Sequence, residues 1–501
     1  MKHSFFGKRD EKENTMLSAG AIVGICIAGV CVAFILFLVL RAVFTTPKKM
    51  NIEEFTPEEI DPDTLAQHLS EAVQIPTVTV INEGQSYEPF LKYHEFLEKT
   101  YPTIHQYAEK TVINGYSLIL KIDGSNPSLL PACFLSHQDV VPAPAEGWDT
   151  EPFGGEIKDG FVHGRGSLDM KGHMIALLEG LETILKRKEK PVRGIYLCFG
   201  HDEEITGKDG ARNIVEYLYQ NNIRFEYVID EGGAIMDGGL LGVPGKIALI
   251  GTCEKGYVDY KLTSVKDGGH ASSPKKRSSV DAIAQAVFDL SHLPMRSYWS
   301  KPIKETFKGL APHMKFIYKL LFANADVLGP LLRLVLSKVN PITNSIVRTT
   351  FAFTQLQGAP APNVIPREAS AVVNVRINIG QTQQEVKEYI QKVVGKEITV
   401  TELNPGFDPT PVSSIEGEAY QLLLKSISEV FKGYIPAPYP FIAASDAKHY
   451  YKVCDRVYRF GPIEMCIDDQ NRIHSNNERC NVQAATQGAQ FFARLIENTC
   501  Y

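Results

Sequence analysis

Short apolar runs that alternate with amphipathic stretches are the feature that most limits what this chain can fold into. Four runs have the length and uniform apolarity of buried strands, at residues 117–122, 132–137, 194–201 and 227–233. The apolar residues of 174–188 and 211–221 instead recur at helical spacing. Strands that alternate with helices predict an α/β fold, in which a mixed, mostly parallel sheet is covered by helices on both faces.

The carboxyl ends of the predicted strands carry groups that bind metals. In an open α/β sheet, ligands bind at these ends. The second run ends in His137, and Asp139 lies two residues further, on the same side of an extended chain. A carboxylate that holds one ring nitrogen of a histidine makes the other nitrogen a better metal ligand. Taken alone, this pair is as typical of a histidine that merely ends a buried strand.

Further carboxylates and one late imidazole fit the same pattern. Asp169 lies in the glycine-rich segment GRGSLDMKG, just before a predicted helix. An aspartate that stabilises the N-terminus of this helix is the alternative to a metal ligand. The third predicted strand leads into Glu203 and Glu204, and the fourth contains Asp230. Adjacent carboxylates repel one another unless a cation neutralises them, and a solvent-facing acidic turn is the alternative. With His474, the set offers the oxygen and nitrogen ligands that two zinc ions need.

Seven motifs resemble, in family order, the zinc metallopeptidases that include aminoacylase, carboxypeptidase S and glutamate carboxypeptidase. They are SHQDVVP, GRGSLDMKG, GHDEE, DEGG, GGHASSP, PNVIP and RIHSNNE, and the resemblance covers residues 62–498. The segments VPAPAEGW and NPITNSIVRTT are most similar to the N-fatty-acyl-amino-acid synthase/hydrolases of that family. The resemblance implies a di-zinc exopeptidase fold with an inserted α+β domain that serves as a lid and a dimer interface.

The resemblance also implies which residues bind metal. The ligands of two zinc ions per subunit would be Asp169 as the bridge, His137 and Asp230 on one ion, and Glu204 and His474 on the other. Glu231 is the alternative to Asp230. Such a pair of ions supplies a hydroxide at neutral pH and polarises an amide carbonyl.

Residues that act on the substrate are implied in the same way. Asp139 would orient and polarise the first imidazole ligand, and Glu203 would be the general base that moves a proton from water to the leaving amine. His270 matches a residue that reaches into the partner subunit's site to stabilise the oxyanion. Asn363 and Arg376 match positions that contact the substrate. Arg376 is suited to an amino-acid carboxylate, with a surface salt bridge as the alternative.

The order of the motifs implies a nested domain, because His474 must return to a site that begins at His137. We expect an N-terminal tail (1–15), a transmembrane helix (16–40), a linker (41–61), the first part of the catalytic domain (62–251), an inserted lid and dimerisation domain (252–380) and the second part of the catalytic domain (381–501). The inserted domain makes a homodimer the expected assembly.

One segment can cross a membrane. Residues 16–40 carry no charge, and as a helix with a rise of about 1.5 Å per residue they span a hydrocarbon core of about 30 Å. The run is longer than the apolar core of a signal peptide, so we expect an uncleaved anchor, with cleavage and secretion as the alternative. Basic residues flank both ends and slightly favour a cytosolic N-terminus, which places the catalytic part in a lumen or outside the cell.

Composition limits the binding partners that can be expected for this chain. The 52 basic and 58 acidic residues give a net charge of −6, so nucleic acid is not an expected partner. The cysteines after residue 40 are scattered and contain no CxxC pair, which argues against a cysteine zinc site.

Residues 303–340 include the apolar, basic and helical stretch HMKFIYKLLFANADVLGPLLRLVLSKV. Core or dimer packing, an acyl-chain groove and contact with a bilayer would each explain it.

These features and the resemblance predict a zinc-dependent amidohydrolase that acts on N-fatty-acyl amino acids. It would cleave them to a fatty acid and an amino acid, or form them in the reverse reaction. A carboxypeptidase or dipeptidase that uses the same metals is the alternative. An inactive, membrane-anchored interaction protein is the alternative from another class, although every matched catalytic position is filled.

Overall fold

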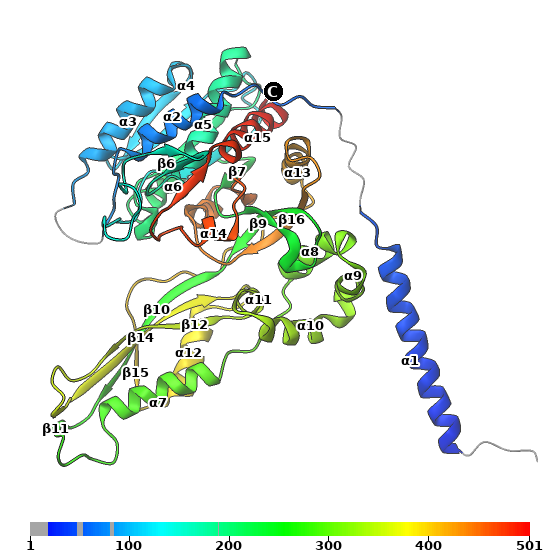
Figure 1. The fold of residues 1–501 in the computed structure, drawn as a ribbon, viewed down its shortest axis with the longest axis vertical. Coiled ribbons are helices and arrows are strands. Elements are labelled where there is room, and N and C mark those ends of the chain that lie inside the picture. Colours follow the sequence, from blue (N-terminus) through cyan, green and yellow to red (C-terminus); the bar gives the residue numbers. More distant parts are fainter. Residues whose placement is uncertain (1–18, 48–53, 81–84, 189) are drawn as a thin grey trace, which may run out of the picture.

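Two β-sheets organise the structure, a computed structural model that describes residues 19–47, 54–80, 85–188 and 190–501 (Figure 1). The larger sheet has nine strands in the order β1-β2-β6-β3-β7-β17-β9-β16, with β8 paired to β9. Their bounds are β1 Glu109–Ile113, β2 Ser117–Ile122, β3 Ala132–His137, β6 Ile195–Gly200, β7 Tyr227–Asp230, β8 Ala234–Asp237, β9 Lys246–Glu254, β16 Ile435–Phe441 and β17 Val457–Arg459.

The four predicted strands are neighbours in this sheet, in the order β2-β6-β3-β7. β3 pairs in parallel with both β6 and β7, and β17 pairs in parallel with β7. Antiparallel pairs occur nearer the edges, between β1 and β2 and between β2 and β6. The predicted α/β class, with a mixed sheet that is mostly parallel at its centre, is confirmed.

Helices cover both faces of the larger sheet, because alternate strand residues point to opposite sides. Leu118 and Leu120 pack with the core of one face, and Ile119 packs with the core of the other. One face carries α2 (Pro62–Val73), α5 (Lys171–Arg187), α13 (Glu418–Val430) and α15 (Val482–Cys500). The other carries α6 (Ala211–Gln220) and the 3₁₀ segment Asp446–Lys452. The helices α3 (Glu88–Thr100) and α4 (Pro102–Tyr107) lie beside α2 and α5.

The smaller sheet is antiparallel, with the order β12-β14-β10-β15. Its strands are β10 Gly256–Val265, β12 Thr350–Gln357, β14 Glu368–Ile377 and β15 Thr399–Glu402, and α7 (Ser279–His292) and α12 (Gln383–Val394) pack on it. A two-stranded ribbon of β11 (Gly269–His270) and β13 (Val364–Ile365) extends from it. Only Lys255 separates β9 of the larger sheet from β10 of the smaller one.

Along the sequence, the strands of the smaller sheet come after β9 and before β16, so the smaller sheet is inserted within the chain segment that forms the larger one. The predicted domain boundaries at residues 252 and 380 stay predictions. β15 lies beyond Gly380 and still pairs with β10, and the backbone returns to the larger sheet where Thr410 N–H donates to the carbonyl oxygen of Glu254. We therefore propose to move the second boundary from residue 380 to about residue 410.

The apolar stretch of residues 303–340 packs against the larger sheet and not against the smaller one. It forms α8 (Lys301–Leu310), α9 (Phe316–Phe322) and α10 (Ala325–Val339), followed by α11 (Pro341–Val347). Ile303, Phe307 and Leu310 of α8 share a buried cluster with Leu249 of β9 and Ala437 of β16. The stretch thus covers the β9–β16 edge of the larger sheet.

The N-terminal apolar run forms α1, a helix of 26 residues from Ala19 to Phe44. It is long and apolar enough to cross a membrane, a property that a signal sequence shares. The predicted tail (1–15) and the first three residues of the predicted transmembrane helix (16–18) lie outside the described residues. Ten large apolar side chains between Ile22 and Phe37 are 44–69% exposed, so α1 stands away from both sheets (Figure 1).

Candidate metal centre

The predicted ligands gather at the edge where the central strands of the larger sheet end. They come from separate segments: His137 from the end of β3, Glu203 and Glu204 from the 3₁₀ turn after β6, Asp230 and Glu231 from the end of β7, Asp169 from the turn before α5, and His474 from the turn between α14 (Ile467–Gln470) and β18 (Arg479–Asn481). Parallel pairing brings the three strand ends side by side. His474 arrives from more than 230 residues further along the sequence.

Asp169 lies between the two imidazoles. Its Oδ1 is 3.1 Å from Nε2 of His137, and its Oδ2 is 3.1 Å from Nε2 of His474. Nε2 of His474 is also 3.1 Å from Oε2 of Glu204. Each oxygen of one carboxylate therefore faces a different histidine, and this placement would allow Asp169 to bridge two cations.

Two overlapping groups of donor atoms, which share His137, are candidates to hold an ion. In one, the donor atoms of His137, Asp169 and Glu204 all lie within 4.8 Å of one another. In the other, those of His137, Glu203 and Glu231 do so. Glu203, to which the family resemblance assigns proton transfer, therefore lies among the candidate donor groups.

At the end of β7, the structure brings Glu231 to the other donors and turns Asp230 away. Oε1 of Glu231 is 3.4 Å from Nε2 of His137. The carboxylate of Asp230 is buried and accepts hydrogen bonds from the backbone N–H groups of Glu231 (2.9 Å) and Ala447 (2.8 Å). In the ligand set that we propose, Glu231 therefore replaces Asp230.

Crowding of acidic groups shifts the pKa values of the site. Removal from water, and then the neighbouring carboxylate of Asp169, raise the pKa of Glu231 to about 7. Removal from water also raises the pKa of Glu203 well above its usual range. Hydrogen bonds to Asp169 and Glu204 raise the pKa of His474 to about 10. Protons on these groups offset the repulsion in the metal-free protein, and a cation would do the same.

Asp139 holds the backbone of the Glu203–Glu204 turn. Its Oδ1 accepts the N–H of Glu203 and its Oδ2 accepts the N–H of Glu204, both at 3.1 Å. Nδ1 of His137 donates to the main-chain oxygen of Asp139 at 2.9 Å, while Oδ1 of Asp139 lies at 3.5 Å. The residue thus orients His137 mainly through its carbonyl group, and this leaves Nε2 of the histidine for a metal.

Thr79 completes this support, and nothing in its sequence context pointed to it. Its buried hydroxyl donates to Oδ2 of Asp139 at 2.7 Å, and its N–H donates to the carbonyl oxygen of Val140. A threonine in an extended segment carries no metal-binding signature. Only the packing of residues 77–80 beside the end of β3 reveals its contact.

Glu478 plays the corresponding role for Asp169. It is fully buried, accepts the N–H groups of Leu168 (2.9 Å) and Asp169 (3.1 Å), and forms an ion pair with Arg165. The motif RIHSNNE contained this residue, but its role was not predicted. The turn also needs Gly166, whose φ is +82° and where a Cβ would lie 2.5 Å from Val140.

The three remaining predicted residues lie outside this cluster. His270 and Asn363 are exposed on the β11–β13 ribbon, where Ala271 N–H donates to the carbonyl oxygen of Asn363. In Figure 1 this ribbon is at the end of the smaller sheet that faces away from the larger one. Arg376 lies on β14, with its guanidinium 4.9 Å from the ring centre of Tyr257. Within one chain, the structure does not bring His270 to the metal ligands.

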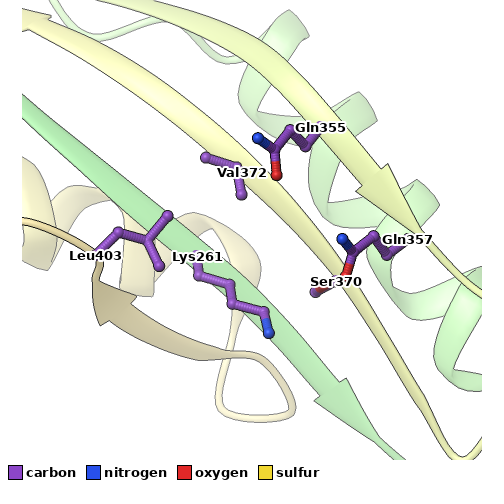
Figure 2. A pocket seen from close by; sticks show the side chains of 6 residues that line it. All are labelled: Lys261, Gln355, Gln357, Ser370, Val372 and Leu403. Carbon is purple, nitrogen blue, oxygen red and sulfur yellow. The ribbon is translucent and has the colours of Figure 1, made fainter. Parts of the chain in front are cut away.

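A shallow pocket on the smaller sheet has a different character from this cluster. It has a volume of about 200 Å³ and is lined by Lys261, Gln355, Gln357, Ser370, Val372 and Leu403 (Figure 2). These side chains project from β10, β12 and β14 and from the residue after β15. They include neither a carboxylate nor an imidazole, so the pocket offers no group for metal-assisted chemistry.

The residues at the edge of the larger sheet fit zinc. Imidazole nitrogen and carboxylate oxygen are ligands that zinc accepts, and catalytic zinc sites combine them. The placement of Nε2 of His137 toward Asp169 and Glu231, the two-sided placement of Asp169 and the mutual repulsion of Glu203 and Glu231 all favour bound cations. The donor set by itself does not distinguish zinc from manganese or cobalt.

Comparison with known proteins gives consistent matches. A family model described as peptidase family M20/M25/M40 matches residues 133–498. The chain is 36% identical over 478 residues to the N-fatty-acyl-amino acid synthase/hydrolase PM20D1 of Xenopus tropicalis, and the match covers 93% of each chain. It is 34% identical over 509 residues to the probable carboxypeptidase S-like 2 of Dictyostelium discoideum, which covers 98% of this chain and 97% of that protein.

Solved structures with the same fold include the M20 family metallo-carboxypeptidase Sso-CP2 from Sulfolobus solfataricus. Its TM-score is 0.64 at 18% identity, over 86% of this chain and 98% of that chain. Human carnosine dipeptidase 1 gives a TM-score of 0.61 at 17% identity, over 87% of this chain and 96% of that chain. At these identities the two structures support the fold alone.

Replacement of Thr79 by valine is expected to weaken metal binding. The change removes the hydroxyl that holds Asp139, so the turn that carries Glu204 loses part of its support. Loss of such an outer contact typically costs roughly tenfold or more in metal affinity. Competition between the protein and a chelator for zinc would measure this loss, and Thr79→Ser should retain the affinity.

Thr77→Val is the matched control for this experiment. Its hydroxyl is equally buried and donates to the carbonyl oxygen of Gln138 at 2.6 Å, not to the carboxylate of Asp139. Both variants should lose thermal stability, but only Thr79→Val should lose zinc affinity. An equal loss of affinity in the two variants would show that Thr79 has only a structural role.

Metal binding is expected to release protons. At pH 7 the metal-free protein carries a proton on His474, whose pKa is about 10, and part of a proton on Glu231, whose pKa is about 7. A metal ion needs both groups deprotonated, so apparent affinity should rise from pH 6 to pH 8. Calorimetric titration of zinc in two buffers with different ionisation enthalpies would count the protons. A heat of binding that does not depend on the buffer would contradict this expectation.

Proposed function

This chain belongs to peptidase family M20/M25/M40 and is a metallo-hydrolase of amide bonds, and we propose that it cleaves and forms N-fatty-acyl amino acids with two zinc ions. The observation that carries the dinuclear assignment is the placement of Asp169, whose two oxygens face two histidines. The substrate class rests on the relatives named N-fatty-acyl-amino acid synthase/hydrolase, which align with most of this chain.

When bound, the zinc ions would lower the pKa of water and polarise the amide carbonyl. His137, Glu231, Asp169, Glu204 and His474 would hold them. Glu203 lies beside these donors and would accept the proton of the attacking water on its carboxylate, and then deliver it to the leaving amine nitrogen. Its raised pKa, which removal from water causes, makes the carboxylate a stronger proton acceptor for the first of these steps. In the reverse direction Glu203 would accept a proton from the attacking amine.

Substitution of Glu203 by glutamine tests the proposed chemistry. Glutamine has a similar shape but cannot carry the proton, so hydrolysis of an N-oleoyl amino acid should fall by roughly 100-fold to 10,000-fold. Zinc content, measured by metal analysis, should remain. Glu418→Gln, an exposed position on α13, is the matched control and should leave hydrolysis unchanged.

The same assay separates the alternatives when it covers a panel of N-acyl amino acids and dipeptides, with and without a chelator. Faster turnover of dipeptides than of acyl amino acids would favour a carboxypeptidase or dipeptidase, which the carboxypeptidase S-like relatives support. A protein that binds no metal and cleaves neither class would instead be an inactive interaction protein.

We also propose that the enzyme is a homodimer in which His270 serves the site of the other subunit. In this chain His270 is exposed on the far ribbon, so a second copy is the means by which it could reach a metal centre. There its imidazole would stabilise the developing oxyanion. Asn363, on the same ribbon, would contact the same substrate, and Arg376 would bind the amino-acid carboxylate.

Complementation between two inactive variants tests this arrangement. His270→Ala and Glu203→Gln should each be nearly inactive alone. In a mixed dimer, one site would combine the intact Glu203 of one subunit with the intact His270 of the other, so co-expression should restore hydrolysis. Activity that stays at the level of the separate variants would show that His270 does not act between subunits.

For location, we propose that α1 stays attached as a single-pass anchor with the N-terminus in the cytosol. Its length and its apolar surface support this reading. The catalytic part would then lie in a lumen or outside the cell. Cleavage after α1, followed by secretion, is the alternative.

A further inference from the structure

The helices α9, α10 and α11 expose an unusual amount of apolar surface. Nine large side chains are 42–61% exposed: Phe316, Ile317, Tyr318, Val327, Leu331, Leu334, Val335, Val339 and Ile342. We call residues 316–342 the apolar hairpin, after the 106° bend between α9 and α10. Soluble monomers rarely leave so many neighbouring apolar side chains in water.

Packing of the protein core does not account for these side chains. The core contacts of α10 are made by its other face, where Gly329, Leu332 and Leu336 are buried. A Cβ at Gly329 would lie 2.6 Å from Trp299, so this side of the helix is tightly packed. On the opposite side, Leu331, Leu334 and Val335 are about half exposed. α10 is therefore apolar on two faces, and only one of them contacts the protein.

The charge around the apolar hairpin is opposite to that of the whole chain. Residues 301–342 contain seven lysines and arginines but only two acidic residues, in a protein with a net charge of −6. Lys308, Lys315 and Lys338 are exposed. Exposed lysines around an apolar surface complement the anionic headgroups of a bilayer.

The apolar hairpin also meets α1 at the C-terminal end of that helix. The side-chain amide of Asn324, between α9 and α10, donates to the carbonyl oxygen of Leu38 at 2.9 Å. Arg41 lies 3.3 Å from Asp326 of α10, and Ala42 is fully buried. Figure 1 shows this end of α1 beside α9. These contacts involve only the last two turns of α1.

From these observations we propose that the apolar hairpin is a membrane-contact surface, which inserts its exposed apolar side chains between lipid headgroups beside the point where α1 leaves the bilayer. The inference rests on the proposed retention of α1 as an anchor. An anchored helix lowers the free-energy cost of this contact, because the hairpin is already held at the membrane surface. A substrate with a long acyl chain would partition into the same lipid layer.

Tryptophan fluorescence in lipid vesicles tests the proposal on the full chain. The vesicles contain phosphatidylserine and phosphatidylcholine, and the phosphatidylcholine is either ordinary or brominated on its acyl chains, because bromine quenches tryptophan only at close range. Leu331→Trp places a reporter on the exposed face of α10, where the native side chain is 56% exposed. Val112→Trp is the matched control, since Val112 is 44% exposed on β1, at the opposite edge of the larger sheet.

The added emission of Leu331→Trp should be lost in brominated vesicles, while that of Val112→Trp should be kept. Addition of Leu334→Gln and Val335→Gln should restore the emission of the reporter at residue 331, and omission of phosphatidylserine should reduce its quenching. Equal quenching of the two reporters, or none at residue 331, would overturn the proposal. So would cross-linking between two copies through Leu331→Cys, because the surface would then be a subunit contact.

Flotation of the full chain with the vesicles is measured first. A protein that does not float lacks the anchor, and this result would reject the proposed location together with the inference. A protein that floats but shows no quenching at residue 331 would reject the membrane-contact surface alone. Hydrolysis of N-acyl amino acids is not a readout in either step, so failure of the proposed catalytic function would be visible separately.

Discussion

The mutual repulsion of carboxylates at one edge of the larger sheet is the constraint on which the rest of this structure depends. Three buried carboxylates, those of Asp139, Asp230 and Glu478, each accept two backbone N–H groups. Five of these six N–H groups belong to the turns that present the proposed ligands or Glu203, and the sixth, that of Ala447, belongs to the 3₁₀ segment Asp446–Lys452. Hydrogen bonds to a charged group are stronger than those between neutral groups, so these contacts can hold the ligand turns together before any metal binds. The remaining repulsion is relieved by protons or by cations.

The smaller sheet is inserted into the chain directly after β9 of the larger sheet. The strands β9 and β10 are continuous apart from Lys255, so the smaller sheet grows out of a strand that lies three places from β3. Its far ribbon carries His270 and cannot approach the metal ligands of its own chain in this arrangement (Figure 1). A catalytic contribution from that ribbon therefore requires a second subunit, whereas every proposed metal ligand comes from one chain.

The helices α8 to α11 divide their apolar residues between two environments. One face closes the β9–β16 edge of the larger sheet, through residues such as Phe307 and Leu310. The other face stays exposed next to α1, with basic residues around it. The catalytic fold, the proposed anchor and the apolar hairpin thus meet at one place. In the proposed arrangement this gives the molecule a defined side toward a membrane, while three of the proposed metal ligands lie at or just after the ends of β3, β6 and β7.

The sequence by itself determined the central strands, the helices that cover them, and most of the proposed metal ligands. Apolar periodicity is a local property, and parallel strands open their carboxyl ends on one edge, so His137 and Glu204 could be grouped before any coordinates were known. The resemblance of the motifs to a known family added Asp169 and His474, and the structure brings all four together. Only the tertiary structure favours Glu231 over Asp230 as the proposed ligand. These neighbours have the same chemistry, and the choice depends on which side chain meets the N–H of Ala447, more than 200 residues away.

The tertiary structure likewise revealed the contact of Thr79 with Asp139 and the two-faced packing of α10. A hydroxyl in an extended segment and an apolar helix look the same in sequence whatever they contact. Their roles are set by distant segments that pack beside them, and local patterns carry no information about those segments.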